Sequence, residues 1–155
     1  MTFVDRIERP EDFRHWLGDM EAEYVYTSGI AGDPFLKELK KGKILGTKCD
    51  NCGKVYVPSR MYCEECFVEI TRWVEVPNDG IVDTYTVVHV DRDENLLEKP
   101  EVWAFIRMEG TDGGFVHKLN VLPEDVNIGM PVKAVFKSKK DREGRITDIL
   151  YFEKP

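Results

Sequence analysis

The chain has 155 residues, of which 42% are apolar, and its formal net charge is −7 at pH 7. This length suits one ordinary domain, or a small domain with a metal-stapled module attached. No apolar run approaches the ~20 residues needed to span a bilayer, and residues 1–9 contain no apolar signal segment, so we expect a cytoplasmic protein without a membrane anchor. The acidity argues against general nucleic-acid binding, because phosphate contacts supply most of that affinity.

Residues 1–42 are predicted to be helical. Apolar side chains recur at helical spacing after Pro10, which predicts an amphipathic helix that carries Phe13, Trp16, Leu17 and Met20 on one face. A second helix is predicted to start with Asp33 as N-cap and Pro34 at the first helical position, and to end at Gly42. The two apolar faces are too short to bury each other fully, so we expect one or both to pack on the rest of the protein or on a partner.

All four cysteines lie in two C-x-x-C pairs separated by ten residues, Cys49 with Cys52 and Cys63 with Cys66. Each pair offers two thiolates on a tight turn, and Zn²⁺ takes four such ligands at tetrahedral corners. We therefore expect residues 43–72 to form a zinc ribbon whose closed Cys₄ site is structural. Two disulfides, four free thiols, or iron held by the same ligands are the alternatives.

The positive charge is concentrated around the first cysteine pair. Residues 37–60 contain seven basic and two acidic residues, a net charge of +5, whereas the rest of the chain carries −12. A small anionic ligand would be attracted to such a patch, although ordinary surface lysines on a solvated helix end give the same pattern.

Residues 73–155 change to the two-residue periodicity of strands. After a turn at 77–80, strands are predicted over 81–90, 102–108, 115–119, 132–136 and 146–151, with a charged loop over 91–100 and a connector over 122–130 that has room for one helical turn. Five strands with an insert between the third and fourth match a Greek-key barrel of the OB type, and a small open sandwich is the alternative. The predicted fold class is thus mainly β with N-terminal helices (α+β), divided at 42/43 and 72/73.

Five stretches resemble one family more specifically than the cysteine spacing alone. They are Gly46-Thr47-Lys48-Cys49-Asp50-Asn51-Cys52-Gly53 with Val57-Pro58-Ser59-Arg60 and Cys63-Glu64-Glu65-Cys66, then Gly80-Ile81-Val82-Asp83-Thr84-Tyr85-Thr86-Val87-Val88, and Gly129-Met130-Pro131-Val132. The chain resembles an archaeal and bacterial family, first catalogued as a domain of unknown function, that pairs a rubredoxin-like zinc ribbon with an OB-fold. The resemblance extends from Phe35 to Val135.

The resemblance implies an accessory role. Members of the family look like acyl-CoA binders that support or bridge thiolase-like and hydroxymethylglutaryl-CoA synthase-like enzymes, and related modules support aldol-type and hydratase steps of acyl-CoA degradation. The zinc ligands carry over as Cys49, Cys52, Cys63 and Cys66. No CoA-contacting position carries over, but Lys40, Lys41, Lys43 and Arg60 are candidates to hold the phosphates of CoA or acyl-CoA.

The sequence gives no sign of an active site of its own. No G-x-S-x-G, H-E-x-x-H or phosphate-cradling glycine loop is present, and His15, His89 and His117 have no sequence-local partner that marks a base. A single-stranded nucleic-acid module is the alternative function, because OB barrels stack bases on aromatics such as Tyr85, Trp103, Phe105 and Phe115. The acidic barrel segment argues against it. A scaffold without a ligand is the third possibility.

Overall fold

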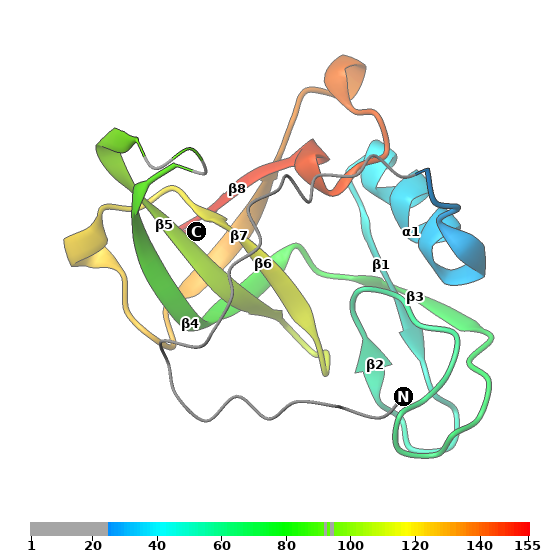
Figure 1. Cartoon of the computed structure of the whole chain (residues 1–155). Helices are drawn as coiled ribbons and strands as arrows, with labels where there is room; N and C mark the ends of the chain where they lie inside the picture. Colours follow the sequence, from blue (N-terminus) through cyan, green and yellow to red (C-terminus); the bar gives the residue numbers. More distant parts are fainter. Residues whose placement is uncertain (1–24, 92, 94) are drawn as a thin grey trace, which may run out of the picture.

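A computed structural model describes residues 25–91, 93 and 95–155. The amphipathic helix predicted after Pro10 lies outside these residues. Within them, no helix combines the length and the apolarity that crossing a membrane requires. The described chain forms one helix, a three-stranded sheet and a closed five-stranded barrel (Figure 1).

Helix α1 spans Gly29–Lys41 and ends at Gly42, as predicted. Gly42 adopts the left-handed conformation with φ 83°, and its N–H bonds to the carbonyl of Leu39 at 2.8 Å, which closes the last turn. The predicted start is wrong, because the helix begins at Gly29 and contains Pro34 in its interior. Asp33 is therefore not the N-cap; its carboxylate instead pairs with Lys37 one turn later, at 2.6 Å.

The ribbon sheet has three antiparallel strands in the order β2-β1-β3. Strand β1 (Ile44–Lys48) and strand β2 (Val55–Tyr56) form the predicted hairpin with the first cysteine pair in its turn. Strand β3 (Arg72–Val76) pairs with β1 along the full length of β1, so the first strand after the second cysteine pair belongs to the ribbon sheet and not to the barrel. The division at 42/43 and 72/73 stays a prediction.

The barrel confirms the OB prediction. Its strands close in the order β4-β5-β6-β8-β7, with β6 parallel to β8 and every other pair antiparallel. The five strands are β4 (Asp79–Val90), β5 (Leu96–Met108), β6 (Gly114–Leu119), β7 (Pro131–Phe136) and β8 (Ile149–Glu153). The connector between β6 and β7 contains the expected single turn of helix, a 3₁₀ turn at Pro123–Asp125. An open sandwich is thereby excluded.

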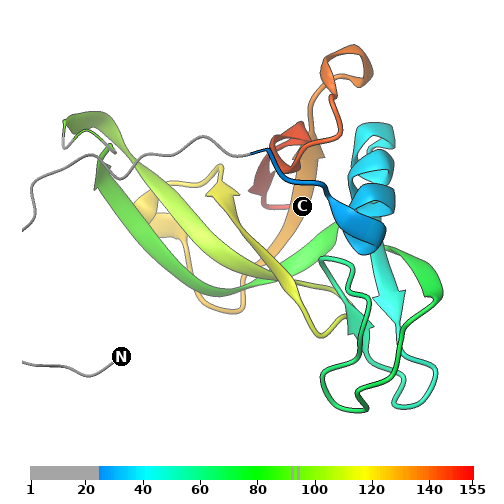
Figure 2. The ribbon, with the colours of Figure 1, turned by 45° about the vertical axis from the view of Figure 1, so that its right-hand side comes forward.

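Two boundaries in the barrel were predicted wrongly. The charged loop over 91–100 is shorter, because β4 and β5 continue beyond the barrel as a hairpin in which Val90 still pairs with Leu96 (Figure 2). The Asp91 carboxylate holds this turn by accepting the N–H of Asn95 at 2.9 Å. The last strand begins at Ile149 and not at Ile146, since Ile146–Asp148 form a 3₁₀ turn.

One hydrophobic cluster joins the helix, the ribbon sheet and the barrel. Phe35 and Leu39 of α1 pack with ribbon-side residues and with the inward-facing residues of all five barrel strands. The ribbon side contributes Ile44, Val57 and Val76. A second, smaller cluster lies at the far end of the ribbon and consists of Cys49, Tyr56, Cys63 and Ile70. The ribbon therefore shares the main core and keeps a small cluster around its cysteines.

Candidate metal centre

The first cysteine turn directly follows β1. The N–H of Cys49 bonds to the Lys54 carbonyl at 2.9 Å, and the N–H of Gly53 bonds back to the Cys49 carbonyl at 2.9 Å. Gly53 has φ 78°, a conformation that favours glycine. This fold of the backbone keeps the side chains of Cys49 and Cys52 on the same side of the turn.

The second cysteine turn repeats the first. The N–H of Cys63 bonds to the Val68 carbonyl at 3.0 Å, and the N–H of Phe67 bonds to the Cys63 carbonyl at 2.9 Å. Phe67 occupies the position of Gly53 and has φ 55°, so a residue other than glycine holds the left-handed conformation here. Its side chain is 84% exposed, which removes any conflict with the packed cysteines.

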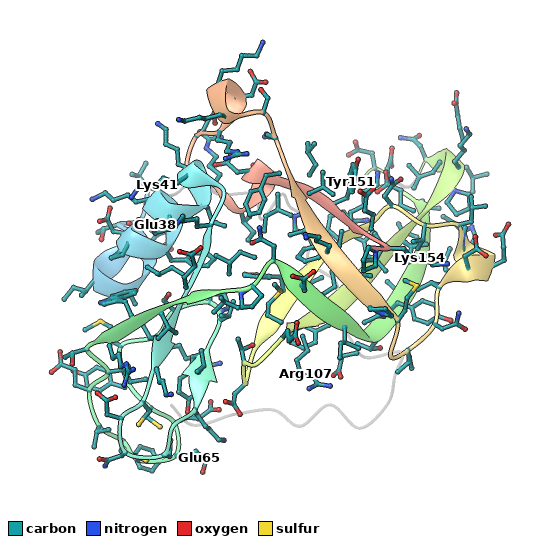
Figure 3. The ribbon with its side chains drawn as sticks, turned by 180° about the vertical axis from the view of Figure 1, so that it is seen from behind. Glu38, Lys41, Glu65, Arg107, Tyr151 and Lys154 are labelled. Atoms are coloured by element: carbon teal, nitrogen blue, oxygen red, sulfur yellow. The ribbon has the colours of Figure 1, made fainter. Side chains whose placement is uncertain are left out.

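The four sulfur atoms converge on one point. All four lie within 4.8 Å of one another, and Cys52 Sγ lies 3.5 Å from Cys63 Sγ. A tetrahedral site with Zn–S bonds of ~2.3 Å places its sulfurs about 3.8 Å apart, whereas a disulfide brings them to ~2.05 Å. The donor set therefore fits Zn²⁺ and not two disulfides. Figure 3 shows sulfur atoms grouped in the ribbon near the labelled Glu65.

A tyrosine that the sequence analysis did not single out supports this group. The Tyr56 hydroxyl lies 3.2 Å from Cys63 Sγ, and both residues are 1% exposed. A thiolate can only accept, so the hydroxyl stabilises the ionised form of Cys63; this contact lowers the pKa of Cys63 to about 6 and raises the pKa of Tyr56. The sequence contains a signal for this role. Side chains alternate between the two faces of a strand, so in Val55, Tyr56 and Val57 the middle side chain faces the cysteines.

The other sulfurs have different surroundings. Cys49 is buried like Cys63, Cys66 is half-buried and Cys52 is exposed, so the group is closed on the side of the ribbon core and open toward its tip. The hydrogen bond with Cys52 and burial raise the pKa of the Cys66 thiol to about 12. The four thiols of the metal-free chain thus do not ionise together, and metal binding displaces the remaining protons.

Comparison with known proteins identifies the two parts of the chain. Residues 36–71 match the rubredoxin-like zinc ribbon domain of ChsH2, and residues 73–137 match its C-terminal OB-fold domain. A "DUF35 domain-containing scaffold protein" of Methanocaldococcus jannaschii is 37% identical over 72% of this chain and 81% of its own length. The chain belongs to the DUF35 family. A second DUF35 scaffold protein, from Methanothermobacter thermautotrophicus, is 27% identical over 63% of this chain and 74% of its own.

Solved structures of the DUF35 family have the same fold. A DUF35 protein of unknown function from Sulfolobus solfataricus superposes with a TM-score of 0.67 at 32% identity, covering 82% of this chain and 87% of the other. A structure described as "Ltp2-ChsH2(DUF35) aldolase" superposes with a TM-score of 0.60 at 22% identity, covering 81% of this chain and 95% of the other. At this identity the similarity shows the fold alone. The resemblance inferred from the cysteine turns and the barrel strands is confirmed.

The predicted phosphate-binding residues do not form one group. Lys40 and Lys41 lie in the last turn of α1, where Lys41 pairs with Glu38 at 2.5 Å. Lys43 pairs with Glu75 of β3 at 2.7 Å. Their contact with CoA stays a prediction.

Arg60 lies apart from these lysines, beside the cysteine group. Its guanidinium pairs with Glu64 at 2.5 Å, and its central carbon lies 5.2 Å from the centre of the Tyr56 ring. Arg60 therefore covers the ring whose hydroxyl supports Cys63. This placement gives it a structural role in the ribbon whatever else it contacts.

The described histidines differ in their surroundings. His89 is exposed on β4, whereas His117 on β6 is only 8% exposed, and its Nδ1 accepts the N–H of Lys118 at 2.9 Å. Burial lowers the pKa of His117. Its ring stacks on that of Trp103, with 6.3 Å between the ring centres.

Proposed function

We propose that this chain is a non-catalytic scaffold subunit that supports a thiolase-like or hydroxymethylglutaryl-CoA synthase-like enzyme and binds its acyl-CoA. The observation that carries this proposal is the 37% identity to a DUF35 scaffold protein, together with the four converging cysteines. Membership of the family supports the accessory role. The chemistry of the four cysteines and of His117 supports the proposed metal and the proposed non-catalytic role.

Zinc is the proposed cofactor, and Cys49, Cys52, Cys63 and Cys66 would hold it. Four thiolates occupy all four tetrahedral positions, so no position is left for water or substrate and the ion serves the fold. The ribbon's own cluster contains four buried residues, too few to order its two loops without metal. Structural zinc contributes roughly 10–16 kcal/mol of apparent binding energy in small domains of this kind.

The aldolase assembly of Ltp2 with ChsH2 supports the proposal of an enzyme partner. A DUF35 chain takes part in that assembly. For the present chain, the resemblance points to a thiolase-like partner or a hydroxymethylglutaryl-CoA synthase-like one.

The use of the reactive groups supports a non-catalytic role. The four thiols would be ligands of the metal, and the Nδ1 atom of His117 accepts a backbone N–H in a buried position. Covalent catalysis needs an activated nucleophile beside a base. Among the described residues, neither a free thiol nor an available imidazole pairs with such a partner.

Copurification tests the proposal most directly. A tagged chain recovered from its native host is expected to bring a thiolase-like or synthase-like enzyme with it and to contain about one zinc per chain. Calorimetry with CoA and an acyl-CoA then tests the ligand. Recovery without an enzyme, or binding of single-stranded DNA or RNA in a salt-sensitive gel shift, would contradict the scaffold role and favour the nucleic-acid alternative.

A further inference from the structure

A cavity of about 310 Å³ opens on the barrel between β6 and β8. This volume is at the small end of the range of ligand sites. The apolar part of its wall comes from β5, β6, β8 and the 3₁₀ turn before β8. The apolar residues that line the cavity are Trp103, Val116, Ile146, Ile149 and Leu150.

The polar part of the wall comes from His117, Thr147 and two lysines, Lys118 and Lys137. The His117 Nδ1 accepts the Lys118 N–H at 2.9 Å, and burial lowers the pKa of the ring. The Lys118 side chain pairs with Glu101 at 2.5 Å. The remaining wall is apolar and suits an apolar group.

The edge of the cavity is built by the connection between β7 and β8, which contributes Lys137, Ile146 and Thr147. The buried carboxylate of Asp148 fixes this connection by accepting three backbone N–H groups, at 3.0, 2.6 and 3.2 Å. Burial raises the pKa of Asp148, but these three donors outweigh it and the pKa is lowered. Asp148 is thus ionised, and the edge of the cavity is held in one shape.

Lys137 lines the cavity, and three more lysines lie in or beside the same β7–β8 connection. We call these four residues the lysine ridge: Lys40, Lys137, Lys139 and Lys140. The end of α1 touches the β7–β8 connection, since a Cβ built on Gly144 would lie 3.9 Å from the Cβ of Lys40. The ridge therefore includes Lys40, near the start of the predicted basic segment, and Lys137, which lines the cavity.

Among the described residues the lysine ridge forms no close ion pair, and only Lys137 acts electrostatically on a buried carboxylate, that of Asp148. The nearby acids have other partners, because Asp141 bonds to Ser138 and Glu143 pairs with Arg145 at 3.2 Å. In the described part of the chain, no carboxylate lies within ion-pair distance of any of the four ridge lysines. The ridge is therefore suited to an anion, and phosphate groups are the anions that lysine binds well.

We propose that the cavity holds the acyl group of an acyl-CoA while its phosphates lie on the lysine ridge. An apolar hollow next to unpaired cations complements a ligand that is apolar at one end and phosphorylated at the other. The proposal rests on the proposed function in taking acyl-CoA as the ligand. It adds where the ligand binds. It keeps Lys40 and replaces Lys41, Lys43 and Arg60, which are paired elsewhere, with Lys137, Lys139 and Lys140.

Calorimetry on the full zinc-loaded chain tests the site, with hexanoyl-CoA and unacylated CoA as probes. Hexanoyl-CoA is expected to bind at least tenfold more tightly than CoA and to change the fluorescence of Trp103, a change that Trp103→Phe removes. Val116→Glu places a carboxylate at the cavity mouth and is expected to weaken hexanoyl-CoA at least tenfold. Its matched control is Ile128→Glu, because Ile128 is 70% exposed, like Val116 at 68%, and does not line the cavity.

The ridge is tested by Lys139→Glu/Lys140→Glu, which is expected to weaken both probes at least tenfold and to reduce the salt dependence of binding. Lys99→Glu, at an exposed lysine of β5, is the control for a change of charge alone. Leu150→Glu, at 44% exposure, repeats the cavity test should Val116→Glu fail to fold.

The outcomes separate the two proposals. If the parent chain binds neither probe, acyl-CoA is not a ligand of the isolated subunit and that part of the proposed function is overturned. If the parent chain binds both probes, and the cavity variants bind hexanoyl-CoA as tightly as Ile128→Glu does, acyl-CoA remains the ligand but the proposed site is wrong. Equal affinity for CoA and hexanoyl-CoA would also overturn the placement of the acyl group.

Discussion

Replacing Tyr56 with phenylalanine removes one oxygen atom and leaves the ring in place. The hydroxyl lies 3.2 Å from Cys63 Sγ in a buried position, so the substitution takes away the donor that stabilises this thiolate. We expect Tyr56→Phe to weaken zinc binding without unfolding the barrel. Groups that hydrogen-bond to a metal ligand commonly tune affinity in this way.

The expected loss follows from the ionisation of Cys63. With a pKa of about 6, this thiol is mostly ionised at pH 7. Without the hydroxyl, the pKa moves toward the ~8.5 of an ordinary cysteine, where only about 3% is thiolate at pH 7. Because the backbone N–H groups of Glu65 and Cys66 also lower this pKa and remain in the variant, competition by the proton then costs at most about 30-fold in zinc affinity, or ~2 kcal/mol. The loss of affinity is expected to shrink toward zero above about pH 9, where Cys63 is ionised in the parent chain and in the variant alike.

Competition with a chromophoric chelator between pH 6.5 and 9.5 measures this difference. Tyr62→Phe is the control, because Tyr62 lies in the same ribbon with its side chain 58% exposed, and it should leave the affinity unchanged at every pH. The reasoning is refuted if Tyr56→Phe binds zinc as the parent chain does at pH 7. It is also refuted if the loss is the same at pH 7 and pH 9.5.

Three further changes have expected outcomes. Leu39→Ala removes a fully buried side chain that joins α1 to the barrel, and should lower the free energy of unfolding by about 2–5 kcal/mol; Ile30→Ala, at 71% exposure on the same helix, should change it by less than ~0.5 kcal/mol in a denaturant titration. Removing zinc with a chelator should expose the backbone amides of Cys49 and Cys63 to hydrogen exchange while β5 and β6 stay protected, and simultaneous exchange of both regions would contradict a local role for the metal. Asp148→Asn should cost about 1.5–3 kcal/mol at pH 7, since an amide oxygen replaces a carboxylate with three donors. Because the folded pKa of Asp148 is lowered, its contribution is present above about pH 4 and lost as the pH falls through the folded value, so thermal melts of parent and variant should converge in acid.

The features that the sequence predicted correctly are those set by local spacing. Two C-x-x-C pairs bring four sulfurs together because each pair lies on a turn closed by its own backbone hydrogen bonds. The barrel strands were recognised because one side of each strand is buried, as at Val102, Ala104, Ile106 and Met108 of β5. Gly42 ended the helix because the left-handed conformation favours glycine.

The features that the sequence did not predict depend on contacts between distant residues. Pro34 suggested a helix start, but the helix already begins at Gly29, while Phe35 and Leu39 beyond Pro34 pack on the core. The pairing of β3 with β1 joins strands that lie on opposite sides of both cysteine turns. The cavity is lined by β5, β6 and the β7–β8 connection, segments whose order in the sequence does not show that they meet.

Only Pro77 and Asn78 connect β3 to β4, and the same buried side chains lie under both. The two halves of the molecule therefore cannot turn independently, unlike domains joined by a flexible linker. A partner bound to the ribbon would therefore meet the barrel at a fixed angle and distance. Residues inserted at this junction are expected to change that angle without altering the surface of the ribbon or of the barrel.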